Sequence, residues 1–201
     1  MKIKKGAMFG LDARIALAIF GALSVISGAA LYNAIQQSRI VSLVTQMDEM
    51  GKAYFAYYLD TGVELDYADT SGNMWDINPK GLVVKPTGVN NWKGPYMPYE
   101  VHSNDLTLVM PGYDFIFFMR ATDDAWNGST SGLATSTCDL VANANKACYV
   151  WVAIRKSNEM EAMAKAVDLY IDGSETLDTG KVRVIDNDYV AMQVGISQIN
   201  N

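Results

Sequence analysis

The chain contains few of the residues from which catalytic and metal sites are usually built. It has one histidine, His102, and two cysteines in 201 residues. It has no glycine-rich phosphate loop, dinucleotide fingerprint, G-x-S-x-G elbow or HExxH motif. A hydrolase triad would need His102, which lies among polar residues in an expected loop. The adjacent Asp123 and Asp124 are expected to be solvated rather than paired in a glycosidase-like cleft. We therefore expect a protein that is not an enzyme.

Charge is absent from one long stretch and proline from an even longer one. No charged residue occurs between Ile15 and Ser38, a run of 24 residues, and no proline precedes Pro79. Residues 15–35 are apolar enough and long enough to cross a bilayer core of roughly 30 Å. A removable secretory signal has a shorter apolar core, of about 7 to 15 residues. We therefore predict a transmembrane segment over residues 15–35 that stays on the protein.

The apolar run continues without a break into amphipathic sequence. Beyond the uncharged stretch, apolar residues recur every three or four positions, at Ile40, Leu43, Met47, Met50 and Tyr54. This spacing places them on one face of a helix. The pattern predicts a single helix over residues 11–60, roughly 75 Å long at 1.5 Å per residue. Its first half would lie in lipid and its second half against a globular head.

Basic residues are concentrated before the apolar run. Four of the 16 lysines and arginines precede it (Lys2, Lys4, Lys5 and Arg14), but only one of the 22 acidic residues does, Asp12. The remainder has 12 basic and 21 acidic residues, a net charge of −9. By the positive-inside rule the N-terminus stays in the cytoplasm and the head is exported. So acidic a head argues against nucleic acid or anionic membrane surfaces as partners.

Residues 61–201 alternate strand-like and helical patterns. Aromatic and β-branched runs predict strands over 105–110, 113–119, 147–154, 181–185 and 189–196. Residues 158–171 favour a helix capped by Ser157 or Asn158, and the small polar stretch 127–137 indicates an exposed loop. The expected fold class is α+β, with the long N-terminal helix packed on an antiparallel β-sheet head of about 140 residues.

The two cysteines lie ten residues apart in the exported part of the chain. Cys148 opens an expected strand and Cys138 precedes a polar interval. An even count at short separation outside the cytoplasm favours a disulfide, which for a loop of this size contributes roughly 3 kcal/mol. Two free buried thiols are the alternative. A metal site on these residues is not expected, because the chain has a single histidine to join them.

The start of the chain resembles a known leader sequence. Residues 4–11 (KKGAMFGL), followed by the apolar helix, resemble the class III leader of type IV pilins and type II secretion pseudopilins. In that family a prepilin peptidase cuts on the cytoplasmic side, after a glycine, and the whole helix stays on the mature protein. The resemblance implies that residues 1–10 are a leader, that Gly10 precedes the cut and that Leu11 becomes the N-methylated terminus. A cut after Gly6 is a weaker option.

The chain departs from the family at one assembly position. Pilins usually have glutamate at the fifth mature position, where it pairs with the terminal amine of a neighbouring subunit. This chain has Ile15 there. Asp12 and Arg14 are the charges nearby, so the resemblance implies either that Asp12 substitutes for the glutamate or that the protein is an atypical minor subunit. Absence of cleavage is the third option.

A second resemblance lies downstream and is independent of the first. Residues 76–82 (DINPKGL) and 91–96 (NWKGPY) are similar to the loop that closes onto the long helix in major pseudopilins. Proline at position 95 disfavours helix at Gly94, so the segment is expected to turn there. Trp75, Trp92, Pro95 and Tyr96 are expected to hold this loop by packing rather than to bind a ligand.

An acidic segment late in the chain suggests one further site. Residues 168–180 carry four carboxylates around two glycines, and major pseudopilins hold calcium in a late loop. By that resemblance Asp172, Glu175 and Asp178 are weak calcium candidates. The spacing does not match an EF-hand, and a solvated turn before the strand at 181–185 is the favoured interpretation. No other cofactor is expected.

Together these features predict a structural subunit, a pilin or pseudopilin of a type IV pilus or type II secretion filament. Its helices would pack on those of its own copies or of related pilins, and small residues such as Gly21, Gly28 and Ala29 would allow close approach. The resemblance implies a prepilin peptidase and an inner-membrane assembly platform as partners. The expected location is the bacterial inner membrane with a periplasmic head, and a filament after assembly. The alternative is a single-pass, signal-anchored periplasmic binding or sensor protein that does not polymerise.

Overall fold

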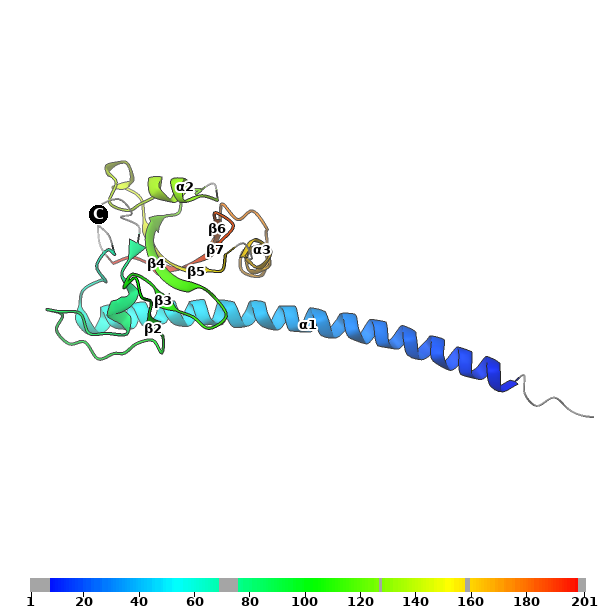
Figure 1. Ribbon diagram of the computed structural model, residues 1–201. Helices are drawn as coiled ribbons and strands as arrows, with labels where there is room; N and C mark the ends of the chain where they lie inside the picture. The colour runs from blue at the N-terminus through cyan, green and yellow to red at the C-terminus, as the bar shows by residue number, and fades with distance from the viewer. Residues whose placement is uncertain (1–7, 69–75, 127, 158–159, 199–201) are drawn as a thin grey trace, which may run out of the picture. The chain divides into compact units, whose positions relative to one another are not determined.

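A computed structural model describes residues 8–68, 76–126, 128–157 and 160–198 (Figure 1). The chain divides into two compact units, Met1–Ser42 and Leu43–Asn201. The predicted α+β fold is confirmed: a long N-terminal helix packs on an antiparallel sheet. The elements in chain order are α1 (Met8–Thr61), β1 (Asp76–Ile77), η1 (Pro79–Leu82), β2 (Glu100–Val101), β3 (Leu108–Val109), β4 (Phe115–Thr122), α2 (Thr130–Thr135), η2 (Val141–Asn143), β5 (Cys148–Arg155), α3 (Met160–Ile171), β6 (Val182–Ile185) and β7 (Tyr189–Ile196).

Helix α1 is 54 residues long and unbroken, as the absence of proline predicts. It extends one residue beyond the predicted end at Asp60 and begins three residues before the predicted start at Leu11. Gly62 ends it: its φ of 74° leaves the helical region, and its N–H donates to the carbonyl of Tyr58 at 2.8 Å. Glycine accommodates this left-handed conformation without the strain of a Cβ, which is why it commonly follows a helix.

The part of α1 in the second unit is a core element of the head. Its buried residues keep the predicted three-and-four spacing: Leu43, Met47, Met50, Ala53, Tyr54 and Tyr57. The Tyr54 ring stacks on Phe118 of β4, with centroids 6.0 Å apart. Gly51 allows a close approach to β7, because a Cβ at that position would lie 2.6 Å from Cβ of Val194. Helix and sheet therefore share one core.

The sheet has the strand order β2-β3-β4-β5-β7-β6, and β1 pairs with β4. Every pairing is antiparallel, and the longest register runs from Phe115 opposite Arg155 to Thr122 opposite Cys148. The predicted strands at 113–119, 147–154, 181–185 and 189–196 correspond to β4, β5, β6 and β7. The strand predicted over 105–110 is shorter than expected, because a turn occupies its first half: the Asn104 side chain accepts from the Leu106 N–H at 3.0 Å and Asp105 has a φ of 60°.

The prediction of an exposed loop over residues 127–137 is wrong for most of that segment. Residues 130–135 form helix α2, and the Ser129 hydroxyl caps it by accepting from the Gly132 N–H at 3.1 Å. Leu133 is fully buried in a cluster on the sheet face that includes Trp126 and Trp151. One apolar side chain among polar ones therefore anchors the segment. Residue 127 lies outside the described residues.

Helix α3 covers the end of the sheet formed by β6 and β7. It begins at Met160, within the predicted span 158–171, and buries Met160, Ala164 and Val167 at the predicted spacing. The predicted cap Asn158 lies outside the described residues. This amphipathic helix completes the α+β head.

Candidate functional site

The first unit presents an apolar surface. Every residue from 10 to 35 of α1 is exposed, and large side chains such as Phe20 and Val25 are 70% and 73% exposed. The Ser24 hydroxyl donates to the Phe20 carbonyl at 2.8 Å, so its polar group is satisfied within the helix. By length and composition this helix can cross a membrane.

Leu11, Asp12 and Arg14 lie on exposed turns of this helix, and Gly10 is itself helical. Ile15, at the position where the leader resemblance would place a glutamate, is 51% exposed. Within the described residues neither Asp12 nor Arg14 forms an ion pair. A separation of two positions corresponds to a rotation of about 200° around a helix, so the opposite charges of Asp12 and Arg14 point to different sides. Cleavage after Gly10 and an assembly role for the two charges stay predictions.

The predicted close-approach residues share a face only in part. Gly21 and Gly28 are seven residues apart, which places them on one side of the helix with Ser24 between them. A Cβ at either glycine would meet nothing within 4 Å, so both backbone surfaces are open. Ala29 lies about 100° further round. The exposed backbone at Gly21 and Gly28 is the part of this surface best suited to close helix packing.

In the second unit, residues 91–96 close onto the end of α1, as their resemblance predicts. The Trp92 Nε1–H donates to the Gly81 carbonyl at 2.9 Å, and the Tyr96 hydroxyl donates to Asp60 Oδ2 at 3.0 Å. Lys93 Nζ lies 2.6 Å from Asp60 Oδ1, and this hydrogen bond lowers the pKa of the Asp60 carboxyl. The loop is therefore tied to the last turn of the helix. Trp75 lies outside the described residues.

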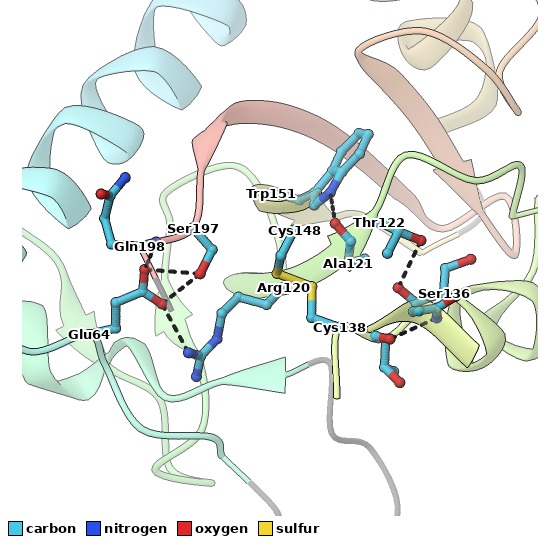
Figure 2. Close-up of a disulfide and its surroundings, with 12 residues drawn as sticks. Glu64, Arg120, Ala121, Thr122, Ser136, Cys138, Cys148, Trp151, Ser197 and Gln198 are labelled. Carbon is cyan, nitrogen blue, oxygen red and sulfur yellow. Dashed lines mark hydrogen bonds and ion pairs between the residues drawn. A yellow bond between two sulfur atoms is a disulfide. The ribbon is translucent and has the colours of Figure 1, made fainter. Parts of the chain in front are cut away.

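The predicted disulfide is confirmed: Cys138 and Cys148 are joined, with Cα atoms 5.6 Å apart, and both are buried (Figure 2). The bond ties the start of β5 to the segment after α2. That segment is also held to β4, because the Thr122 N–H donates to the Ser136 carbonyl at 2.8 Å. The Asn143 amide donates to the Thr137 carbonyl at 2.8 Å. The disulfide therefore closes a loop that is already ordered by hydrogen bonds.

A buried ion pair that no local sequence pattern predicts joins three distant segments. The side chains of Glu64 and Arg120 are 1% and 2% exposed, and Arg120 Nη1 lies 2.9 Å from Glu64 Oε2. The Ser197 hydroxyl donates to the Glu64 carboxylate at 2.9 Å, and the Gln198 N–H also donates to it (Figure 2). The guanidinium of Arg120 stands 4.0 Å from the centre of the Tyr67 ring. We call Glu64, Arg120, Ser197 and Gln198 the carboxylate clamp.

Within the carboxylate clamp the two buried charges of Glu64 and Arg120 neutralise each other, and each also has hydrogen-bond partners. Arg120 Nη2 donates a further hydrogen bond to the Leu65 carbonyl at 3.1 Å. Burial raises the pKa of the nearby Tyr54 hydroxyl, and the charge of Glu64 acts in the same direction. The clamp connects the segment after α1, strand β4 and the end of β7. Its geometry is that of a structural tie, and sequence could not reveal it because the paired residues are 56 positions apart.

The acidic segment does not bring its calcium candidates together. Asp172 Oδ2 accepts from the N–H groups of Lys181 and Val182 at 2.7 and 3.0 Å, so this carboxylate organises the turn before β6. Among the described residues, which include all of 160–198, no group of three or more His, Cys, Asp or Glu side chains could hold a metal ion. Glu175 and Asp178 therefore do not join Asp172 in a ligand set.

The remaining sequence candidates occupy separate surroundings. Asp123 pairs with Arg183 at 2.9 Å, whereas Asp124 pairs with Lys146 at 2.6 Å, so the adjacent carboxylates have different partners. The hydrogen bond from Lys146 lowers the pKa of Asp124. His102 lies in the turn after β2, where its Nδ1 accepts from the Asn104 N–H at 3.4 Å.

The fold and the exposed helix are thus the features on which a functional interpretation depends. Comparison of the chain with protein-family models, with curated proteins and with solved structures finds no match.

Proposed function

We propose that this protein is a pilin-like subunit that is held in the membrane by α1 and assembles into a filament through that helix. The observation that carries the proposal is the continuity of α1. One unbroken helix of 54 residues is exposed over residues 10–35 and uncharged from Ile15 to Ser38, yet from Leu43 onward it is part of the core of the head. The resemblance of residues 4–11 to a class III leader supports the same interpretation.

The exposed surface suits helix association better than lipid contact alone. In lipid, apolar side chains provide little drive for association, so close packing at small residues and polar contacts become decisive. Gly21 and Gly28 offer open backbone on one side of the helix. Outside lipid, the exposed side chains of this unit need new apolar partners, which the helices of neighbouring subunits supply. An inner-membrane assembly platform would provide the work of extraction.

Asp12 and Arg14 provide a mechanism of registration that does not need glutamate at position 15. Because they point to different sides of α1, Asp12 of one subunit pairs with Arg14 of the next. A contact between two different surfaces of the same subunit is heterologous, and repeated heterologous contacts build helical filaments. In an apolar setting such a pair is strongly favoured over two unpaired charges.

The N-terminus of the mature protein tests the proposal. The full chain is expressed in a bacterium together with a prepilin peptidase, and its intact mass and N-terminal residue are measured by mass spectrometry. We expect a chain that begins at Leu11 with a methylated amine. Gly10→Val should block the cut, whereas the matched variant Gly6→Val should not. A wild-type chain that retains Met1 or Lys2 would instead support the anchored, non-polymerising alternative.

A charge exchange tests registration. In cells that assemble the filament, Asp12→Arg and Arg14→Asp should each reduce the amount of sheared filament about tenfold or more, because each leaves like charges facing one another. The double exchange should restore it. Equal filament yield from both single variants would contradict pairing between these residues.

A further inference from the structure

A cavity of about 260 Å³ opens on the sheet face where the Trp126 cluster lies. It is bounded by side chains from five elements of the head: Phe115 and Phe117 of β4, Asp76 of β1, Leu133 of α2, Ile185 of β6 and Tyr189 of β7. The lining is largely apolar, and its apolar residues Leu133, Ile185 and Phe117 are buried. The cavity is slightly smaller than typical ligand pockets of roughly 300 Å³ or more, which suits a small ligand.

Three aromatic rings meet at this cavity because of the strand register. Phe115 of β4 and Tyr189 of β7 both lie opposite Arg155 of β5, so they share one row across the sheet. In the next row Phe117 lies opposite Ala153, whose small side chain leaves room. The ring centres are 6.4 Å apart for Phe115 and Phe117, 6.2 Å for Phe115 and Tyr189, and 5.3 Å for Phe117 and Tyr189.

The charges around the rings favour a cation. Among the described residues that line the cavity, Asp76 is the one side chain charged at neutral pH. Burial raises the pKa of the Tyr189 hydroxyl, and the carboxylates of Asp188, Asp76 and Asp186 act in the same direction, against Arg155. The chain from residue 15 onward carries a net charge of −9, and this negative charge also draws cations toward the head.

Arg155 shows that two of these rings, Phe115 and Tyr189, already contact a cation. Its guanidinium lies 5.3 Å from the centre of Phe115 and 5.5 Å from that of Tyr189. It does not line the cavity, and its charge is balanced by Asp188 at 3.1 Å and Asp114 at 3.7 Å. A ligand in the cavity would therefore meet aromatic rings and one carboxylate without facing an uncompensated positive charge.

We infer that this cavity binds a small organic cation, an ammonium group on a short alkyl body. The aromatic rings of Phe115, Phe117 and Tyr189 would contact the alkylated ammonium, since the faces of such rings attract cations. Asp76 would balance its charge, and Leu133 and Ile185 would pack against the alkyl part. The ammonium could come from a free quaternary amine or from a lysine side chain of another protein. The cavity includes no part of the exposed helix, so its ligand is independent of the proposed filament.

Calorimetric titration of the full chain in micelles of an uncharged detergent tests this inference. The probes are choline, its neutral isostere 3,3-dimethylbutan-1-ol, and N-acetyl-lysine amide. We expect saturable binding of choline or of the lysine amide at millimolar concentration or below, and binding of the neutral alcohol at least tenfold weaker. Tighter binding of choline assigns the site to a free amine, and tighter binding of the lysine amide assigns it to a protein side chain.

Variants locate the site. Asp76→Asn should weaken binding about tenfold, whereas the matched charge change Asp105→Asn, at a side chain paired with Lys80 outside the cavity, should leave it within twofold. Tyr189→Leu should weaken it about 2- to 30-fold, the range of one cation–π contact. Thr130→Arg, at an exposed position on the cavity wall, should abolish binding without disturbing the core.

Three results would overturn the inference. The first is no saturable binding of either cation up to about 10 mM. The second is equal binding of choline and the neutral alcohol. The third is unchanged binding in both Asp76→Asn and Thr130→Arg, each with wild-type circular dichroism and an intact disulfide.

Discussion

Removal of Arg120 tests whether the carboxylate clamp holds the head together. In Arg120→Met the apolar stem is largely kept, but Glu64 loses its cationic partner while it stays almost fully buried. An unpaired buried charge is costly, and breaking one partner of a buried pair typically destabilises by about 3 to 5 kcal/mol. Two remaining donors, from Ser197 and Gln198, still solvate the carboxylate. We therefore expect a loss of about 3 kcal/mol in the free energy of unfolding.

The assay is urea unfolding of the full chain in uncharged micelles, followed by tryptophan fluorescence with the disulfide intact. Trp126 and Trp151 are fully buried and report on the core. At a typical slope of about 1 to 3 kcal/mol per molar urea, a loss of 3 kcal/mol moves the midpoint by about 1 to 3 M. The matched control is Lys52→Met, which removes exposed ion pairs to Asp48 and Glu49 and should leave the midpoint unchanged.

A double-mutant cycle separates the pair from its surroundings. Glu64→Gln alone should also destabilise, because its amide presents a donor to neighbouring donors. The double variant Glu64→Gln/Arg120→Met should lose less than the two single losses combined, since neither buried charge remains unpaired. Additive losses, or a loss below about 1 kcal/mol in Arg120→Met, would refute the role assigned to the carboxylate clamp.

Three further predictions concern the rest of the head. Burial raises the pKa of Asp168, so the wild-type chain should lose stability as the pH rises through that raised pKa; Asp168→Asn should remove this dependence and be the more stable at neutral pH, measured by urea midpoints from pH 4 to 8. Replacing Cys138 and Cys148 by alanine should cost about 3 kcal/mol, and a reductant should lower the wild-type midpoint to match while leaving the variant unchanged. Gly51→Ala should cost roughly 1 to 3 kcal/mol by overpacking against Val194, and Val194→Ala should partly restore the thermal midpoint of the Gly51→Ala chain; an undisturbed single variant would contradict the close contact.

The elements that the sequence predicts well are those whose signals are local. The span of α1 follows from the absence of proline and from regular apolar spacing, and its end follows from Gly62. Strand β7 has the bounds expected from its apolar run. The strand before β4 is shorter than predicted because Asn104 and Asp105 make a turn that hydrophobicity does not reveal. Helix α2 was not predicted, because its six residues contain one large apolar side chain, Leu133, and so show no helical periodicity.

Long-range contacts set the limit of what sequence could predict for the sites. The disulfide could be predicted, because two cysteines allow one intramolecular pairing. The partnership of Glu64 with Arg120 was not, since both residue types usually lie on the surface and nothing local marks a buried pair. The aromatic cavity also depends on register: Phe115 and Tyr189 are distant in sequence and meet because both lie opposite Arg155.

The second half of α1 is an integral part of the head and not a stalk that carries it. Between Leu43 and Tyr57 it buries five large side chains (Leu43, Met47, Met50, Tyr54 and Tyr57). At about 1.5 to 3 kcal/mol for each, their withdrawal would cost roughly 8 to 15 kcal/mol. That is as large as the whole stability of an ordinary domain, about 5 to 15 kcal/mol. A head without these residues would therefore not fold, so in the proposed filament the element that stabilises the head and the element that joins the subunits are one continuous helix.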